Sequence, residues 1–276
     1  MEPSQVRCAV EAARLTACEL GLQVDDAVVV HDSDRIAVRL IPCDVLARIA
    51  PRAWEDGLRF EAEVARHLAE TGSPVGELEP RAEPRVYVRD TFALTLWIYY
   101  EQVGEVAPAD YADALIRVHA GLRQIDLAAP HITDRVAAWA EEVDDREGTP
   151  ELPGPDRELL STTFRRVRNV INRWGTGDQL LHGEPHPGNL LSTSRGPRFI
   201  DLHTCQRGPV EYDLAYVPED VAAHCPGADQ HLVQQFRVLM WAGFTTMRWR
   251  PWDQLPDREY WRVEGLNRLR AVLGRA

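Results

Sequence analysis

The first third of the chain has the hydrophobic pattern of β-strands. Ile36, Val38 and Leu40 alternate with polar or small residues, as in a strand with one buried face. The segment from His31 to Asp34 is rich in turn formers, so it favours an antiparallel connection. We predict strands at 27–30, 36–40, 45–49, 86–88 and 94–100.

Helical periodicity dominates the remainder of the chain. Tyr111, Leu115, Val118 and Leu122 recur at spacings of four, three and four, as on one face of a helix. We predict helices within 2–20, 54–68, 111–122, 160–174, 232–244 and 258–273, a Pro- and Gly-rich loop over 148–155, and one hairpin over 180–202 with its turn at 194–197.

The change of pattern near Gly104 divides the chain into two lobes of unequal size. Residues 1–100 form a β-rich lobe, and residues 101–276 form a larger, mainly helical lobe with one hairpin. Clefts between unequal lobes are common ligand sites. No run of eighteen apolar residues and no signal-peptide pattern occurs, so we expect no membrane span and a cytoplasmic protein.

Composition narrows the classes of partner. The five cysteines are odd in number and contain no CxxC pair, which argues against a disulfide framework and a structural zinc site. The net charge of −12 disfavours nucleic acid and is compatible with a cationic substrate, although acidity also serves solubility. All 31 basic residues are arginine, so arginine must fill any role of lysine.

Three polar motifs follow one another in the second half of the chain. They are His182-Gly-Glu-Pro-His-Pro-Gly-Asn189, Ile200-Asp201-Leu202, and Gly208-Pro-Val-Glu-Tyr-Asp213-Leu-Ala. Phosphoryl transfer needs a group that orients the attacking hydroxyl, oxygen ligands for Mg²⁺, and positive charge on the phosphates. An acidic residue on a rigid loop, an Asn five residues later and an Asp on the next strand supply the first two.

The order and spacing of these motifs resemble those of the aminoglycoside phosphotransferase and choline-kinase-like family, relatives of protein kinases. That family has HGDxHxxN, then an ID strand, then GPxxxDLA. Each motif alone is weak, but the three in order are specific, and the resemblance extends over most of the chain. It implies an α+β, bilobal protein-kinase-like fold, with a nucleotide-binding lobe (1–100) before a catalytic and substrate-binding lobe (101–276).

The resemblance also assigns roles within the motifs. Glu184 stands where the family has its catalytic Asp, and Asn189 and Asp201 match the Mg²⁺ ligands. Asp213 matches the residue that braces the catalytic loop, and His182 supports the same loop. His186 is a weaker candidate. Pro185 and Pro187 prevent the helix that a two-histidine zinc site would need.

The nucleotide contacts implied by the resemblance lie in the first lobe. The family's phosphate-binding Lys and its Glu partner correspond best to Arg48 and Glu61, with Arg39 and Glu63 as alternatives. The nucleotide loop falls near 32–35 and contains no glycine. The other expected nucleotide contacts are Ser33 in that loop and Tyr99, Tyr100 and Glu101 in the connecting segment 97–101.

The resemblance therefore implies a kinase that uses ATP or GTP with Mg²⁺ to phosphorylate a hydroxyl of a small molecule. An aminoglycoside-like or other antibiotic, and hence antibiotic resistance, is one expectation; choline-like alcohols, sugars and biosynthetic intermediates stay open, as does the oligomeric state. Glu184 departs from the family's Asp, and its extra methylene moves the carboxylate by about 1.5 Å at full extension. The alternative is a catalytically impaired, nucleotide-binding regulatory pseudokinase. Protein phosphorylation is disfavoured because the segment after Asp201 is short.

Other residues with an open role lie outside the motifs. His119 is expected to be a structural histidine. Four tryptophans near the carboxyl end can either pack in the core or form a wall of the substrate site. They are Trp241, Trp249, Trp252 and Trp261.

Overall fold

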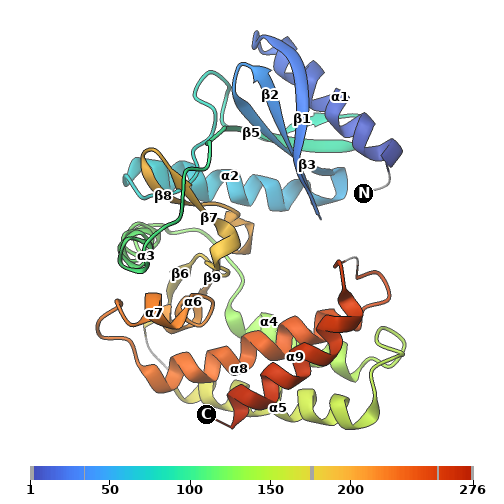
Figure 1. Cartoon of the computed structure of the whole chain (residues 1–276), viewed down its shortest axis with the longest axis vertical. Helices are drawn as coiled ribbons and strands as arrows, with labels where there is room; N and C mark the ends of the chain where they lie inside the picture. Colours follow the sequence, from blue (N-terminus) through green and yellow to red (C-terminus); the bar gives the residue numbers. More distant parts are fainter. Residues whose placement is uncertain (1–2, 34, 175–176, 254, 275–276) are drawn as a thin grey trace. The chain divides into compact units, whose positions relative to one another are not determined.

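The chain forms two compact units. A computed structural model describes residues 3–33, 35–174, 177–253 and 255–274 (Figure 1). Unit 1 comprises Met1–Leu127 and Gly188–Thr204, and unit 2 comprises Ala128–Pro187 and Cys205–Ala276. The two functional lobes expected to divide near residue 100 stay a prediction. Of the sequence-based predictions, the helix start at Glu2 and the turn residue Asp34 lie outside the described residues.

The centre of unit 1 is a five-stranded antiparallel sheet with the strand order β1-β2-β3-β5-β4. The strands are β1 Val24–Asp32, β2 Ile36–Pro42, β3 Val45–Pro51, β4 Tyr87–Arg89 and β5 Phe92–Ile98. Buried residues alternate along β2 and β3, as the sequence pattern predicts. Their buried side chains, such as Val38 and Ala47, form one core with Ala9 and Ala13 of helix α1 (Pro3–Glu19). Figure 1 shows α1 along this face of the sheet.

The rest of unit 1 packs around helix α2. This helix, Glu55–Glu70, follows the short 3-10 helix η1 (Arg52–Trp54) and has a strongly amphipathic sequence. Helix α3, Pro108–Leu122, lies against a hairpin of β7 (Leu190–Thr193) and β8 (Gly196–Phe199), where the rings of Tyr111 and Phe199 meet at 5.7 Å. Two 3-10 turns flank the hairpin, η2 at Pro187–Asn189 and η3 at Leu202–Thr204.

Unit 2 is mainly helical. Its long helices are α4 Ile132–Asp144, α5 Gly154–Trp174, α8 Gln230–Met247 and α9 Arg258–Leu273, and its short ones are α6 Val210–Leu214 and α7 Glu219–Ala222. A two-stranded sheet pairs β6 (Gln179–Leu181) with β9 (Gln206–Gly208). Helix α4, strand β9 and the two short helices were not predicted, and α5 begins inside the predicted loop.

The core of unit 2 is rich in aromatic residues. Trp139, Phe164, Tyr212, Phe236 and Trp249 belong to one buried cluster. Core packing, the default expectation for the tryptophans, therefore holds for Trp249. Trp252, in contrast, is 67% exposed. No helix among the described residues is long and apolar enough to cross a bilayer.

Candidate active site

A pocket in unit 1 lies on the face of the sheet opposite the α1 core. Strand alternation buries Val38 and Ala47 in that core and leaves Ala37, Leu46 and Arg48 on the other face. These three residues line a cavity of about 610 Å³. Cavities of this size hold small molecules and cofactors. The other face of the cavity is made by Asn189 and the segment that follows β8.

An ion pair at the base of this pocket joins β3 to α2. Arg48 donates through Nη1 to Glu61 Oε1, and Glu61 is fully buried. The second nitrogen, Nη2, lies 2.5 Å from Oδ1 of Asp201. Burial works against the charge of Arg48, but the two carboxylates outweigh it and raise the pKa of this guanidinium. The guanidinium thus bridges two acids that are far apart in the sequence.

The alternative pair considered for this role is not formed. Arg39 points to the same side of the sheet but pairs with Asp44 at 2.7 Å and lies 4.1 Å over the ring of Tyr99. Glu63 is on the exposed side of α2. Of the two pairings that the resemblance allowed, the structure contains Arg48 with Glu61.

Arg35, which the sequence reasoning did not select, also reaches Glu61. Its Nη1 lies 2.8 Å from Glu61 Oε2, so each carboxylate oxygen accepts from a different arginine. Arg35 stands at the end of the β1–β2 turn and lines the pocket. Burial lowers the pKa of Arg35, and the neighbouring charge of Glu61 only partly compensates.

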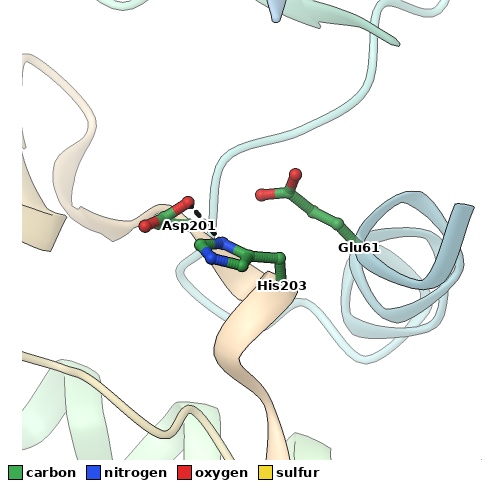
Figure 2. Close-up of side chains that lie close together, drawn as sticks. All are labelled: Glu61, Asp201 and His203. Carbon is green, nitrogen blue, oxygen red and sulfur yellow. Dashed lines mark hydrogen bonds and ion pairs between the residues drawn. The ribbon is translucent and has the colours of Figure 1, made fainter. Parts of the chain in front are cut away.

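Asp201, which follows β8, has an unusual backbone conformation and a further contact with His203. Its backbone is in the left-handed region with φ of 70°, where an Asp is tolerated better than most residues. Oδ1 lies 2.8 Å from Nδ1 of His203 (Figure 2). Burial opposes the charged form of Asp201, but the hydrogen bond from His203 and the charge of Arg48 hold its pKa well below the ordinary value. Asp201 is therefore a carboxylate throughout the neutral range.

Asn189 is brought to the same place by the hairpin. The carbonyl of Asn189 accepts from the N–H of Ile200 at 3.0 Å, which sets Asn189 beside the residue preceding Asp201. Both Asn189 and Asp201 line the pocket. Magnesium and calcium take oxygen ligands, and an amide oxygen with a carboxylate is a donor set of that kind.

A wider cluster of possible metal ligands surrounds Asp201. Glu61, Asp201 and His203 each offer an atom within 4.8 Å of the others, and Figure 2 shows the Glu61 side chain extending from α2 toward the other two. Both oxygens of Glu61 already accept from arginines. The donor set that fits a hard cation is therefore Asp201 with Asn189, and Glu61 serves the guanidinium groups instead.

Three of the four residues expected to contact the nucleotide line the pocket, and the fourth does not. Ser33, Tyr99 and Tyr100 line the pocket beside Arg48. Tyr100 donates to Glu77 at 3.2 Å, and burial raises its pKa to about 12. Glu101 is exposed and does not belong to the lining.

The loop that carries Glu184 belongs to unit 2 and is fixed by Asp213. The Asp213 carboxylate accepts the N–H of His182 at 2.9 Å and that of Gly183 at 2.8 Å. His182 and Asp213 are fully buried. Gly183 has φ of 93°, a conformation that residues with a Cβ rarely adopt. Nδ1 of His182 also accepts the N–H of Glu184 at 3.4 Å, so these contacts are those that a bracing role requires.

Glu184 itself is ion-paired within unit 2. Arg135 of α4 donates through Nη2 to Oε1 of Glu184, and both side chains are about three-quarters buried, at 25% and 23% exposed. The Arg135 guanidinium lies 4.9 Å over the ring of Trp139. Burial acts against its charge, but Tyr212, Tyr216 and Glu184 raise its pKa. Sequence reasoning missed Arg135, because the capping box that begins α4 is formed by His131 and Asp134 and lacks the usual Ser/Thr and Glu/Gln pattern.

Comparison with known proteins gives one family. The model of the phosphotransferase enzyme family matches residues 20–252. No curated protein matches the chain at a significant level.

Three solved structures with similar folds are distant from this chain in sequence. The GDP complex of wild-type aminoglycoside 2'-phosphotransferase-IIIa is 15% identical with a TM-score of 0.69, over 96% of this chain and 98% of that one. Amicoumacin kinase hAmiN in complex with AMP-PNP, Ca²⁺ and Ami is 11% identical with a TM-score of 0.71, over 98% and 96%. Choline kinase LicA from Streptococcus pneumoniae is 11% identical with a TM-score of 0.70, over 96% and 99%. These likenesses confirm the predicted α+β, protein-kinase-like fold.

Proposed function

Because the chain belongs to the phosphotransferase enzyme family, we propose that it transfers the γ-phosphoryl group of ATP or GTP to a hydroxyl of a small molecule, with a divalent metal ion. One observation carries this proposal. The unit 1 pocket brings Arg48, Glu61, Asn189 and Asp201 together from four separate segments of the chain. They supply a cation for the phosphates, a buried acid that holds this cation, and two oxygen ligands for a metal ion, which phosphoryl transfer needs around a nucleotide.

The nucleotide would occupy the pocket with its phosphates toward Arg48. Its base would lie toward Tyr99 and Tyr100, which also line the pocket. Arg48 would donate hydrogen bonds to phosphate oxygens, and Glu61 would keep the guanidinium in place.

Asn189 and Asp201 would hold Mg²⁺. The metal ion would neutralise charge on the phosphate oxygens as the transferred group separates from the diphosphate. His203 and Arg48 fix the Asp201 carboxylate before the metal ion binds.

Glu184 would act on the acceptor. The acceptor oxygen attacks the γ-phosphorus, the bond from that phosphorus to the bridging oxygen breaks, and a nucleoside diphosphate leaves. The proton of the hydroxyl passes to the Glu184 carboxylate and then to solvent. Arg135 pairs with Glu184 and holds this longer side chain in one position. Asp213 and His182 keep the loop rigid.

The acceptor is proposed to be a hydroxylated compound that also carries an amino or ammonium group. The net charge of −12 attracts cations. The names of the similar structures refer to an aminoglycoside phosphotransferase, an amicoumacin kinase and a choline kinase. Antibiotic resistance and a cytoplasmic location belong to this proposal.

The test is metal-dependent consumption of ATP and GTP across a panel of aminoglycosides, other hydroxylated antibiotics, amino alcohols and neutral sugars. We expect one amino-bearing compound to stimulate turnover and to gain a phosphoryl group by mass spectrometry. Asn189→Ala and Asp201→Ala should abolish this turnover, while Asp56→Ala, an exposed acid on α2, should not. Nucleotide binding without turnover on any compound would contradict the proposed kinase and favour a regulatory protein.

A further inference from the structure

Arg35 is a charged residue of the pocket to which the proposed function gives no role. It is 6% exposed and lines the cavity together with Arg48 and Asp201. We infer that Arg35 is a second phosphate-binding residue, which together with Arg48 forms a two-guanidinium site for the β- and γ-phosphates of the nucleotide. This inference rests on the proposed nucleotide site and adds a binding residue to it.

The first argument is the charge around Glu61. Arg35 and Arg48 each take one oxygen of this single carboxylate, so two positive charges face one negative charge. Asp201 balances the second positive charge in the structure, and it is assigned to the divalent metal ion. When Asp201 holds that ion, one positive charge of the arginine pair is left for the bound anion. A buried excess of one charge is unfavourable unless a counter-charge binds next to it.

The second argument is the number of hydrogen-bond donors. A guanidinium has five N–H groups, and Arg35 uses one of them on Glu61. Its Nε is buried and has no acceptor among the described residues of the protein. A buried donor without a partner costs free energy, and phosphate oxygens are strong acceptors for a guanidinium fork. An oxyanion in the pocket would accept hydrogen bonds from the part of the guanidinium with which Arg35 lines the cavity.

The third argument is the turn from which Arg35 projects. The family-type loop at this position would be expected to bind phosphate through backbone N–H groups, and here the segment 31–35 has no glycine. The N–H of Ser33 already donates to the carbonyl of Arg35 at 3.1 Å. That backbone donor is therefore not available to a phosphate. The Arg35 side chain supplies the missing donors from the same turn.

The experiment compares nucleosides with nucleoside diphosphates. Binding of adenosine, guanosine, ADP and GDP in the presence of Mg²⁺ is measured by calorimetry for the wild type, Arg35→Gln and Arg59→Gln. Arg59 is an exposed arginine of the same unit that pairs with Glu55 on α2. We expect Arg35→Gln to lower the affinity for ADP and GDP by roughly ten- to a hundredfold, because charge-assisted hydrogen bonds to the phosphates are lost. Nucleoside affinity should change less than about twofold, and Arg59→Gln should bind like the wild type.

Three outcomes would overturn the inference. Equal diphosphate affinity in the wild type and Arg35→Gln removes Arg35 from the phosphate site but leaves the proposed function intact. An equal loss of affinity for nucleosides and diphosphates means that Arg35 only holds the Glu61 side chain in position. No binding of any nucleotide to the wild type refutes the proposed function and the inference together.

A second variant covers the case in which Arg35→Gln does not fold. Arg35→Lys keeps the charge next to Glu61 but loses the fork of donors. We expect it to retain the thermal stability of the wild type and to lose diphosphate affinity selectively, by a smaller factor than Arg35→Gln. Wild-type diphosphate affinity in Arg35→Lys would contradict the donor argument.

Discussion

At the scale of single side chains, the two acids proposed for chemistry are both held by arginine. Asp201 contacts Arg48 and His203, and Glu184 contacts Arg135. A guanidinium is planar and stays charged, so an ion pair with it fixes the position of a carboxylate. For Glu184 this matters more than for an Asp, because its side chain has one more rotatable bond whose freedom must be lost before it can act.

Removal of the Arg135 guanidinium should therefore lower the rate more than the affinity. We expect Arg135→Gln to reduce kcat by on the order of 10- to 100-fold with little change in KM for the nucleotide, because the Glu184 carboxylate loses its fixed position. Steady-state kinetics with the acceptor found by screening checks this. Arg165→Gln, an exposed change on α5 of the same unit, is the control. A change confined to KM would argue against a positioning role.

The motif residues could be predicted from the sequence, whereas their arginine partners could not. His182, Glu184, Asn189, Asp201 and Asp213 follow a fixed local spacing, which a single sequence reveals. Their roles in the chemistry stay predictions. The pairing of Arg135 with Glu184 spans 49 positions and that of Arg35 with Glu61 spans 26. No local pattern marks such a contact, because it depends on how separate elements pack.

At the scale of elements, helices α4 and α8 meet at a glycine. A Cβ added at Gly243 would lie 2.6 Å from the ring of Trp139, well inside contact distance. Trp139 also stacks on Phe164 and lies under Arg135. The close approach of the two helices at Gly243 therefore fixes the position of the Trp139 ring, over which Arg135 lies.

Gly243→Ala should consequently destabilise unit 2. We expect a loss of about 1–3 kcal/mol in the free energy of unfolding, because the buried ring must shift. Chemical denaturation followed by tryptophan fluorescence measures it. Gly154→Ala, where an added Cβ would meet nothing within 4 Å, should stay within about 0.5 kcal/mol of the wild type. Equal stability of the two variants would mean that α4 and α8 can separate at little cost.

A second contact between elements has a pH dependence. Glu79 is buried beside β5, accepts from Arg81 Nε at 2.6 Å, and Arg81 in turn donates to the carbonyl of Cys43. Burial raises the pKa of Glu79, but the hydrogen bonds and charge of Arg81 outweigh it, so the net pKa is lowered. A carboxyl with a lowered pKa stabilises the fold above its ordinary value of 4.5, and the stabilisation is lost as the pH falls through the folded-state pKa.

We therefore expect Glu79→Gln to be less stable than the wild type at pH 7, with a difference that shrinks progressively below about pH 4.5. Urea unfolding at a series of pH values measures this difference. Glu83→Gln is the control, because Glu83 forms an exposed pair with Arg85 in the same connection. A difference for Glu79→Gln that does not vary with pH would contradict the assignment of the stabilisation to the ionised carboxyl.

The predicted elements were those with a strong local pattern. All five strands of the unit 1 sheet and the helices with clear apolar faces, such as α3 and α8, were predicted. Strand β9 has only three residues and exists because it pairs with β6, which is distant in sequence. Helix α4 was missed because its N-cap is His131 with Asp134 at N3, and this pair is not the Ser/Thr and Glu/Gln pattern that marks a capping box in a sequence.

At the scale of the whole molecule, the chain contains no lysine side chain, since all 31 basic residues are arginine. Arginine-selective dicarbonyl reagents should therefore abolish activity, and lysine-selective reagents should leave it unchanged. We expect bound nucleotide with Mg²⁺ to protect against the dicarbonyl, because Arg35 and Arg48 line the pocket. Peptide mapping by mass spectrometry identifies the protected positions. If bound nucleotide protected neither Arg35 nor Arg48 from modification, the nucleotide would have to bind elsewhere.

Unit 1 is built from two separate stretches of chain, Met1–Leu127 and Gly188–Thr204. During synthesis the ribosome completes the five-stranded sheet long before it reaches the hairpin. Sixty residues of unit 2 are translated in between, which at about 5–20 residues per second takes several seconds. Until the hairpin emerges, the buried Glu61 and its two arginines have no Asp201 beside them, and the apolar surface of α3 that receives Phe199 is uncovered. The order of synthesis therefore makes the wall of the pocket that contains Asn189 and Asp201 the last part of unit 1 to become available for folding.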